Sequence, residues 1–384
     1  MQAGVLAAVL AWAGVAGAQE QYLGYHSGPL TNQPAMALTS RDLDVLSEAP
    51  AGLVLPANPG TPMLAVWKTP LAPGGQVLMA AVQTKPDGPY DRMVIDANAN
   101  GRLDDDQAVE ATDLRAFKDL QSCRFAGLKL KLPAADGPVT YHMDISFYKS
   151  GKLFRLRAQS ACWYEGRIDL DGQPVDCLLL DSNVNGLFND IDADPLKSDF
   201  LKLGDRPMGR VGKYVKVGDA FHQLTVAPDG SALTLTPAGD LAMGQVQATG
   251  VDVLCAAGAN GVFFCDTREG PAKLPIGSYR VMTWLISREK GGAKFEATGT
   301  ATKPIAFDVL ADQAAVLDVG EPLLGSATLQ ATPNGEYQVS DPKLVGRSGE
   351  RVTLTRNDKQ VEAPRFKVTN EDGSYSQQLS FSYG

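Results

Sequence analysis

The stretch VTYHMDISFY, residues 139–148, alternates apolar and polar side chains from Val139 to Phe147. Successive side chains of a β-strand point to opposite faces, so this alternation indicates a strand with one buried face. Turn-forming residues recur on either side of it, in a chain that contains 39 Gly and 24 Pro. Such spacing favours short strands joined by turns. The sequence therefore predicts a mainly β protein built from antiparallel sheets.

The neighbouring segment GRIDLDGQPVDCLLLD, residues 166–181, has the pattern of a β-hairpin. Asp171-Gly172 is a favoured pair for a two-residue turn, and the apolar second arm suits a central strand. Helical signals are few. The segment LTSRDLDVLSEAP (38–50) has a Ser or Thr cap and stops before a proline, which predicts one or two helical turns. A second short helix is expected within residues 105–121.

The N-terminus begins MQAGVLAAVLAWAGVAGAQEQ, an uncharged apolar run that ends in Ala-Gly-Ala before Gln19. The run is short for a membrane span, and its last residues fit a signal-peptidase site. Residues 1–18 are therefore expected to be a signal peptide, and the mature chain to be secreted, periplasmic or extracellular. The alternatives are an N-terminal helix packed on the protein and a misassigned start. No other long apolar run follows, so the mature chain is expected to have no membrane span.

The formal net charge is −9 and the isoelectric point is near 5.0. This balance offers no basic face to neutralise phosphates, so no nucleic-acid partner is expected. The acidic surplus suits solubility and divalent cations. The length allows two or three domains. We expect a β-rich domain over residues 19–238 and two small β-sandwiches over 239–318 and 319–384.

Both C-terminal sections carry sandwich signals. The piece LPIGSYRV, residues 274–281, resembles the strand-entry motif of prealbumin-like and carboxypeptidase-regulatory-like sandwiches. The resemblance implies a small antiparallel sandwich and brings no active residue with it. In the last section, aromatic and apolar residues recur with one parity after a turn at residues 370–373. This pattern predicts the terminal hairpin of an Ig-like sandwich.

The chain contains five cysteines and no C-x-x-C pair, which makes a zinc site a poor prediction: Cys123, Cys162, Cys177, Cys255 and Cys265. A three-residue hairpin loop with Gly261 at positive φ would set residue 258 opposite 262. Counting outward then places Cys255 opposite Cys265. The cross-strand spacing suits a disulfide between them. The alternative is two buried free thiols.

The segment DSNVNGLFNDID, residues 181–192, supplies oxygen atoms at alternating loop positions and a glycine at the sixth. Calcium takes several oxygen ligands at once, and a short loop can wrap it only if the backbone turns sharply at its middle. The predicted ligands are Asp181, Asn183, Asn185, Leu187, Asn189 and Asp192. Leu187 would bind through its backbone carbonyl, and the others through their side chains.

This ligand order resembles EF-hand-type loops, and more closely those of dockerins and thrombospondin repeats, where Asp often closes the loop. The resemblance implies a structural Ca²⁺ ion. Two features depart from an EF-hand: Asp192 stands at the closing position, and a strand rather than a helix precedes Asp181. A calcium sensor is therefore not implied. The alternative is a metal-free turn, because Asp and Asn side chains hydrogen-bond their own backbone.

A partial copy of the motif lies 85 residues earlier, in RMVIDANANGRLDDD. Each copy has an apolar strand followed by Asp-x-Asn-x-Asn-Gly. The closing position of the earlier copy is the neutral Gln107, which weakens the calcium prediction there; Asp106 or Glu110 could substitute if the loop is shifted. Its candidate ligands are Asp96, Asn98, Asn100 and Asp104.

The sequence contains no H-E-x-x-H, G-x-S-x-G, phosphate-loop or G-x-G-x-x-G motif, whereas a Cys-His pair and paired carboxylates stay open alternatives. The three histidines do not cluster in the sequence, and His142 lies on the polar parity of its strand, which indicates a solvated residue. Trp67, Trp163 and Trp284 sit among apolar neighbours, so core packing is favoured over a sugar-stacking platform. We therefore expect a non-catalytic structural or binding protein with a cell-envelope protein or a glycan as its partner. The alternatives are a glycan-cleaving hydrolase that uses two carboxylates and a carbohydrate-binding module.

Overall fold

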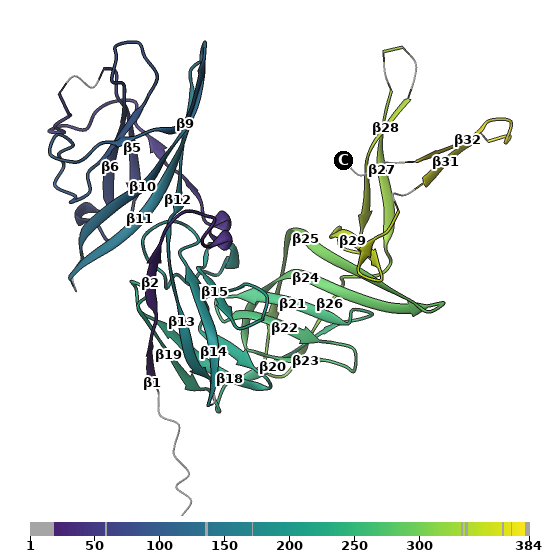
Figure 1. Ribbon diagram of the computed structural model, residues 1–384. Helices are drawn as coiled ribbons and strands as arrows, with labels where there is room; N and C mark the ends of the chain where they lie inside the picture. The colour runs from purple at the N-terminus through teal and green to yellow at the C-terminus, as the bar shows by residue number, and fades with distance from the viewer. Residues whose placement is uncertain are drawn as a thin grey trace, which may run out of the picture. The chain divides into compact units, whose positions relative to one another are not determined.

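A computed structural model describes residues 19–57, 60–134, 137–170, 172–331, 333–334, 337–362, 365–369 and 371–380 (Figure 1). Within these ranges the chain is mainly β, and nearly all strand pairs are antiparallel, which confirms the predicted fold class. The helical elements described are short 3₁₀ turns: η1 (Pro34–Leu38), η2 (Pro73–Gly75) and η3 (Pro195–Lys197). The predicted signal peptide, residues 1–18, lies outside the described ranges. No helix in those ranges has the length and apolar character needed to cross a membrane.

The chain forms two compact units. The first comprises the described residues up to Ile191 together with Lys197–Gly239. The second comprises Asp192–Leu196 together with the described residues from Asp240 onward. Each unit has its own sheets.

The first unit contains four sheets. One has the order β4 (Asp44–Val45), β5 (Met63–Lys68), β6 (Gln76–Val82), β7 (Arg92–Ile95), β8 (Val109–Glu110). The next, here called sheet C, has the order β3 (Arg41–Asp42), β12 (Leu153–Ser160), β11 (Gly137–Ser150), β10 (Leu120–Ala134), β9 (Thr112–Phe117). Sheet B has the order β16 (Gly209–Arg210), β15 (Phe200–Leu203), β14 (Gln173–Leu180), β13 (Cys162–Leu170), β2 (Gly24–Ser27). The last has the order β1 (Gln19–Tyr22), β19 (Ala232–Pro237), β18 (Ala220–Val226), β17 (Tyr214–Val217).

The alternating stretch quoted first lies in β11, between β10 and β12. Its apolar side chains from Tyr141 to Phe147 are at most 1% exposed, as the alternation predicts. The predicted hairpin also forms, because Leu170 pairs with Gln173 across the turn; Asp171 itself lies outside the described residues. The short helices predicted within 38–50 and 105–121 are wrong. Strands form there instead, since pairing with neighbouring strands outweighs weak local helix propensity.

The core of the first unit joins its sheets to the second polar loop. Trp67 stacks on Tyr141 with ring centroids 5.3 Å apart, and its indole N–H donates to the carbonyl of Val184, 2.5 Å away. Phe188, from the same loop, meets the ring of Tyr164 edge-on at 5.0 Å. The loop is therefore part of the core of this unit.

The second unit contains a long sheet that includes strands from both sides of residue 318. Its order is β22 (Gly261–Asp266), β21 (Val253–Gly258), β24 (Gly277–Lys290), β25 (Ala293–Val309), β29 (Arg351–Arg356), β28 (Tyr337–Val345), β27 (Leu324–Ala331), and β30 (Lys359–Gln360) pairs with β29. A smaller sheet has the order β23 (Ala272–Pro275), β20 (Met243–Ala248), β26 (Ala314–Leu317), in which β20 and β26 run parallel. The hairpin of β31 (Arg365–Thr369) and β32 (Ser376–Ser380) follows. Buried Glu350 ties the long sheet to the preceding segment, because it accepts hydrogen bonds from Trp284 Nε1 and Gly320 N.

The predicted disulfide is wrong. All five cysteines are free, and all are buried. The hairpin of β21 and β22 has a two-residue loop, since Gly258 pairs with Gly261. Cys255 therefore stands opposite Phe264 rather than Cys265. A shift of one residue sends a side chain to the other face of a sheet, so the two thiols point to opposite faces.

Candidate functional site

The two polar loops follow the same backbone path. Asp96 comes directly after β7, and Asp181 comes directly after β14. The fourth residue of each loop, Ala99 or Val184, has a φ of 55° or 54°. The glycine at the sixth position also has a positive φ in both loops. The internal repeat seen in the sequence is therefore a repeat of structure.

The hydrogen bonds of the loops also correspond. The carboxylate at the first position accepts the N–H groups of the fifth and sixth residues, at 2.9 and 2.8 Å for Asp96 and at 3.2 and 2.6 Å for Asp181. The amide nitrogen of the fifth residue donates to the Asp at the tenth position. This distance is 2.9 Å from Asn100 to Asp105 and 2.6 Å from Asn185 to Asp190. Each loop is thus closed by its own side chains.

The second loop is much more deeply buried than the first. Asp181 is fully buried and also accepts a hydrogen bond from the Tyr141 hydroxyl, 2.9 Å away. In the first loop, Asn98 and Asn100 are exposed. Burial raises the pKa of the Asp181 carboxyl above its usual range, although the N–H group of Gly186 and the Tyr141 hydroxyl oppose the rise.

Asp199, which no sequence motif marks, completes the surroundings of the second loop. Its two carboxylate oxygens accept the N–H groups of Ser182 and Asp190, at 2.9 and 2.8 Å. Burial raises the pKa of this carboxyl, and the charges of Asp181 and Asp190 raise it further. Only the return of the chain at η3 brings Asp199 to the loop, so the sequence pattern could not reveal it.

The predicted calcium-binding character has no support in the described residues. The described residues contain no group of three or more His, Cys, Asp or Glu side chains placed to hold a metal ion. In the second loop, Asn183 and Asn185 direct their amide N–H groups, which are donors and not metal ligands, at Asp190. Asp192 accepts the N–H group of Asp194 at 2.7 Å. The described residues therefore give the calcium prediction no support.

The remaining candidate ligands have roles in the turns themselves. Asn98 accepts the N–H group of the fifth loop residue at 3.0 Å, and Asp104 pairs with Arg102 at 2.6 Å. Leu187 donates its N–H group to the Asn185 side chain at 2.8 Å, and Asn189 is half-buried. The hydrogen bonds accepted by Asn98 and Asn185 are those of Asx turns, which need no metal.

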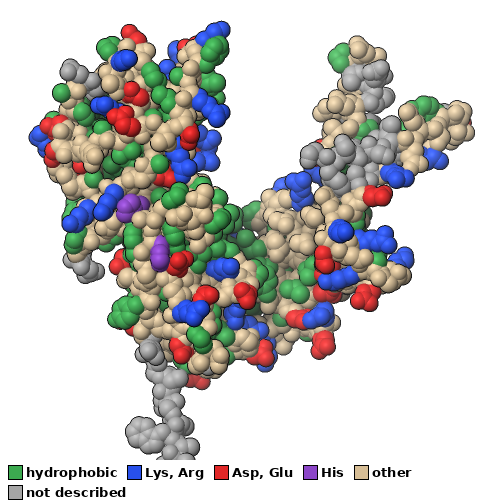
Figure 2. Space-filling model, viewed as in Figure 1, with side chains coloured by type: hydrophobic (Ala, Val, Ile, Leu, Met, Phe, Trp, Pro, Cys, Tyr) green, Lys and Arg blue, Asp and Glu red, His purple; other side chains and the backbone are tan. Residues whose placement is uncertain are grey.

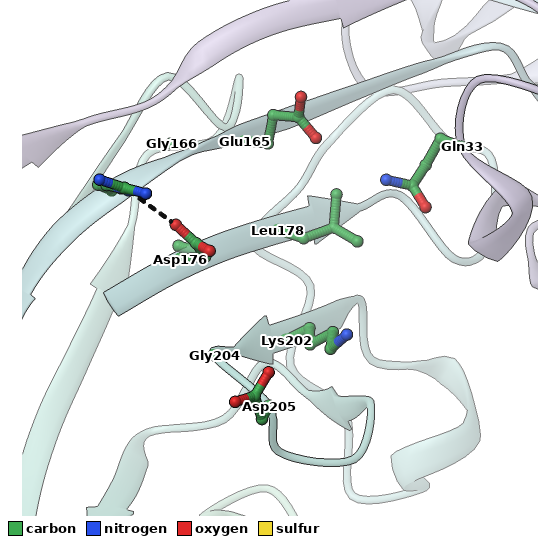
Figure 3. A pocket seen from close by; sticks show the side chains of 10 residues that line it. Gln33, Glu165, Gly166, Asp176, Leu178, Lys202, Gly204 and Asp205 are labelled. Atoms are coloured by element: carbon green, nitrogen blue, oxygen red, sulfur yellow. Dashed lines mark hydrogen bonds and ion pairs between the residues drawn. The ribbon is translucent and has the colours of Figure 1, made fainter. Parts of the chain in front are cut away.

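A second candidate site is a cavity of about 510 Å³ on the outer face of sheet B. Figure 3 shows its side chains on three successive strands, with Glu165 on β13, Leu178 on β14 and Lys202 on β15. These residues form one row, because Glu165 pairs with Leu178 and Leu178 with Lys202. Asp205 lines the cavity from the turn after β15, and Gln33 from the residue before η1.

The cavity forms where the cover over sheet B ends. In the adjoining part of the same face, Trp163, Leu180 and Phe200 pack beneath Met36 of η1. Beyond that apolar cluster the strands carry charged side chains, among them Glu165, Asp176 and Lys202. The change from apolar to polar along the strands therefore determines both the packing of η1 and the position of the cavity.

The charged groups of the cavity are only partly paired. Asp176 pairs with Arg167 at 3.1 Å, and Glu165 accepts a hydrogen bond from Trp163 Nε1 at 3.0 Å, with His26 Nε2 at 3.6 Å. Lys202 and Asp205 form no ion pair with another described residue. The site thus presents a free ammonium and a free carboxylate beside the apolar side chain of Leu178.

Sequence reasoning missed this cavity. The polar side chains at alternate positions of β13 and β14 could have indicated it, because the predicted hairpin already placed Glu165 and Leu178 side by side. The contribution of Lys202 and Gln33 depends on contacts between distant segments.

The sequence was correct about the tryptophans: Trp67, Trp163 and Trp284 are at most 5% exposed and pack in the core. His142 is half-buried rather than solvated, and its Nδ1 lies 2.5 Å from the Tyr25 hydroxyl.

Comparison with known protein families, curated proteins and solved structures gives no match for this chain.

Proposed function

We propose that this chain is a non-catalytic binding protein whose cavity on sheet B takes a small neutral hydroxylated ligand, such as a sugar. The observation that carries the proposal is the cavity itself. Its volume lies within the range of about 300 to 1,000 Å³ that small-molecule sites occupy. The twin loops then have a structural role, as turns that fix the ends of β7 and β14.

The chemistry of the lining supports a hydroxylated ligand. A hydroxyl group both donates and accepts hydrogen bonds, whereas a carboxylate only accepts and an ammonium only donates. Asp205 and Lys202 therefore offer complementary partners to neighbouring hydroxyls, and Gln33 adds an amide. Leu178 provides an apolar surface for the C–H groups of the ligand.

The same lining favours binding over glycan cleavage. A glycosidase needs a general acid that apolar surroundings keep protonated. The side chain of Glu165 is 42% exposed, and its neighbours are an indole N–H group and an imidazole. Asp176 is held by Arg167 and is more exposed still. Asp205, the third carboxyl group of the cavity, is exposed to water. None of the three carboxyl groups therefore has the apolar environment of a general acid.

Calorimetric titration with a panel of neutral mono- and oligosaccharides tests the proposal. The double variant Lys202→Ala/Asp205→Asn should lower the affinity for any bound sugar by at least about tenfold, because the ammonium donor is lost and the carboxylate is replaced by a neutral, weaker acceptor. The matched control is Lys213→Ala/Asp87→Asn, which changes the same residue types at exposed positions outside the cavity. This control should bind like the unmutated protein.

Two results would contradict the proposal. If the double variant binds the sugar as tightly as its control, the ligand does not occupy the cavity. If the protein releases reducing ends from a glycan and Glu165→Gln stops the release, the cavity belongs to a hydrolase and not to a binding protein.

A further inference from the structure

Two turns at one end of sheet C lie side by side. One joins β9 to β10, and the other joins β11 to β12. The N–H group of Gly151 in the second turn donates to the carbonyl of Asp119 in the first, at 3.2 Å. We call this end the double-turn tip and define it as residues 115–122 and 147–155. Figure 1 shows the hairpin of β9 and β10 projecting at this end.

The tip carries a row of exposed apolar side chains. Phe117 pairs with Leu120, Leu120 with Ser150, and Ser150 with Leu153, so these residues share one face across four strands. Phe117, Leu120 and Leu153 are 71%, 47% and 62% exposed. This face lies opposite the one that contributes to the core of the unit, because the alternate residues of β10 and β11 are buried.

Cations surround the apolar row. Lys118 and Lys152 lie in the two turns, and Arg115 and Arg155 stand in the next row of side chains. Lys149 points to the other face, where its ammonium lies 5.8 Å from the centroid of the Phe154 ring. The tip contains these five cations and a single acid, Asp119, although the whole chain has a net charge of −9. One of the five, Arg155, is paired with Asp42 of β3 at 2.7 Å, so the other four provide the unpaired positive charge. Figure 2 shows hydrophobic and Lys or Arg side chains together along this end of the unit.

We propose that the double-turn tip binds the surface of an anionic lipid bilayer. Phe and Leu side chains favour the boundary between headgroups and acyl chains, and nearby Lys and Arg side chains are attracted to anionic headgroups. The geometry fits this partner, because the apolar row and two of the lysines stand at the very end of the sheet. The apolar side chains can enter the bilayer while the cations reach the headgroups.

A protein partner fits this surface less well. A stable protein interface buries about 800 Å² on each partner, whereas three side chains at a tip offer on the order of a few hundred Å². A second copy of the chain would present the same positive tip, so a symmetric contact between tips is repulsive. A soluble polyanion would need the cations and would leave the apolar row without a partner.

Co-sedimentation with phospholipid vesicles tests this inference. The probes are vesicles of phosphatidylcholine alone and of phosphatidylcholine with about 30% phosphatidylglycerol, at low and at high salt. We expect binding to the anionic vesicles, no binding to the neutral ones, and weaker binding at high salt, because salt screens the attraction between the lysines and the headgroups.

Two pairs of variants identify the surface. The apolar variant Phe117→Ser/Leu153→Ser has the matched control Leu196→Ser/Val316→Ser, two apolar residues that are 61% and 68% exposed elsewhere. The charge variant Lys118→Gln/Lys152→Gln has the control Lys290→Gln/Lys303→Gln, at exposed positions of the second unit. Each tip variant should lower vesicle binding by at least about tenfold, and each control should leave it unchanged. Melting temperatures should match within each pair, because all the substituted side chains are exposed.

Several outcomes would overturn the inference. Absence of binding to anionic vesicles would do so, as would binding that survives both tip variants. Loss of binding in the charge variant alone, together with competition by a soluble polyanion, would identify a polyanion site. Concentration-dependent self-association that the apolar variant abolishes would identify a protein interface. The sugar titrations of the cavity are unaffected by any of these results, so the two proposals stand or fall separately.

Discussion

His142 shows at the scale of one residue how a neighbouring strand sets the properties of a side chain. It stands opposite Lys129 in the pairing of β10 with β11. Burial lowers the pKa of His142 below its usual 6.5, and the charge of Lys129 lowers it further, while Asp144 opposes the change. The folded chain therefore holds this imidazole neutral at a pH where the unfolded chain protonates it.

The lowered pKa of His142 makes the folded state less stable in acid. A histidine whose pKa is lower in the folded state contributes stability that is complete above the unfolded value near 6.5 and is lost as the pH falls from that value through the lower folded pKa. Lys129→Gln removes one cause of the shift, so the melting temperature should fall less between pH 7 and pH 5 than in the unmutated protein. Lys131→Gln, two residues along the same strand face, is the matched control and should keep the original slope. Identical slopes in the two variants would show that the Lys129 charge does not act on His142.

At the scale of elements, the two loops show that the same local structure can be tightly packed in one place and open in another. Gly101 and Gly186 occupy the same loop position with φ of 80° and 93°. A Cβ atom at Gly101 would meet nothing within 4 Å. A Cβ atom at Gly186 would stand 2.6 Å from Leu71 Cδ1 and 3.3 Å from Thr69 Oγ1. The second loop is therefore packed against the segment after β5, and the first loop is open at this point.

This difference predicts unequal effects of the same substitution. Gly101→Ala should cost about 1 kcal/mol of unfolding free energy, because an L residue is strained at positive φ. Gly186→Ala adds a clash in a packed core and should cost about 2 to 4 kcal/mol. Denaturant melts of the two variants provide the comparison. Equal losses would mean that Leu71 moves aside freely and that the second loop is no better packed than the first.

At the scale of the whole molecule, the five cysteines are spread over both units and all are buried. Burial raises the pKa of Cys123, Cys162 and Cys255 to about 11, and that of Cys177 to about 12. The thiolate is the reactive form of cysteine, so these thiols should react slowly while the protein is folded.

A thiol titration tests this arrangement in the entire chain. The thiol reagent 5,5′-dithiobis(2-nitrobenzoate) should detect close to five thiols in denaturant without reductant, and almost none at neutral pH in the native protein. A reductant should leave the melting temperature unchanged. A count of three in denaturant would reveal a disulfide and would contradict the free-thiol assignment.

The sequence by itself determined the features that depend on near neighbours. Alternation predicted the buried face of β11, and Asp171-Gly172 predicted the hairpin of β13 and β14. The repeated Asp-x-Asn-x-Asn-Gly pattern predicted two equivalent loops, because a carboxylate that accepts N–H groups four and five residues later needs only a local turn. These features follow from side-chain periodicity and turn chemistry over a few residues.

Only the tertiary structure decided what depends on distant segments. It replaced the helix predicted within 105–121 with strands and moved Cys255 out of register with Cys265 by one residue. It buried Asp181 beside Asp199, and it brought Gln33 and Lys202 to one cavity. It also gathered five cations at the double-turn tip of an acidic chain, which total charge conceals. The physical reason is the same throughout: strand register and chain return are set by packing over the whole unit, and no short window of sequence contains that information.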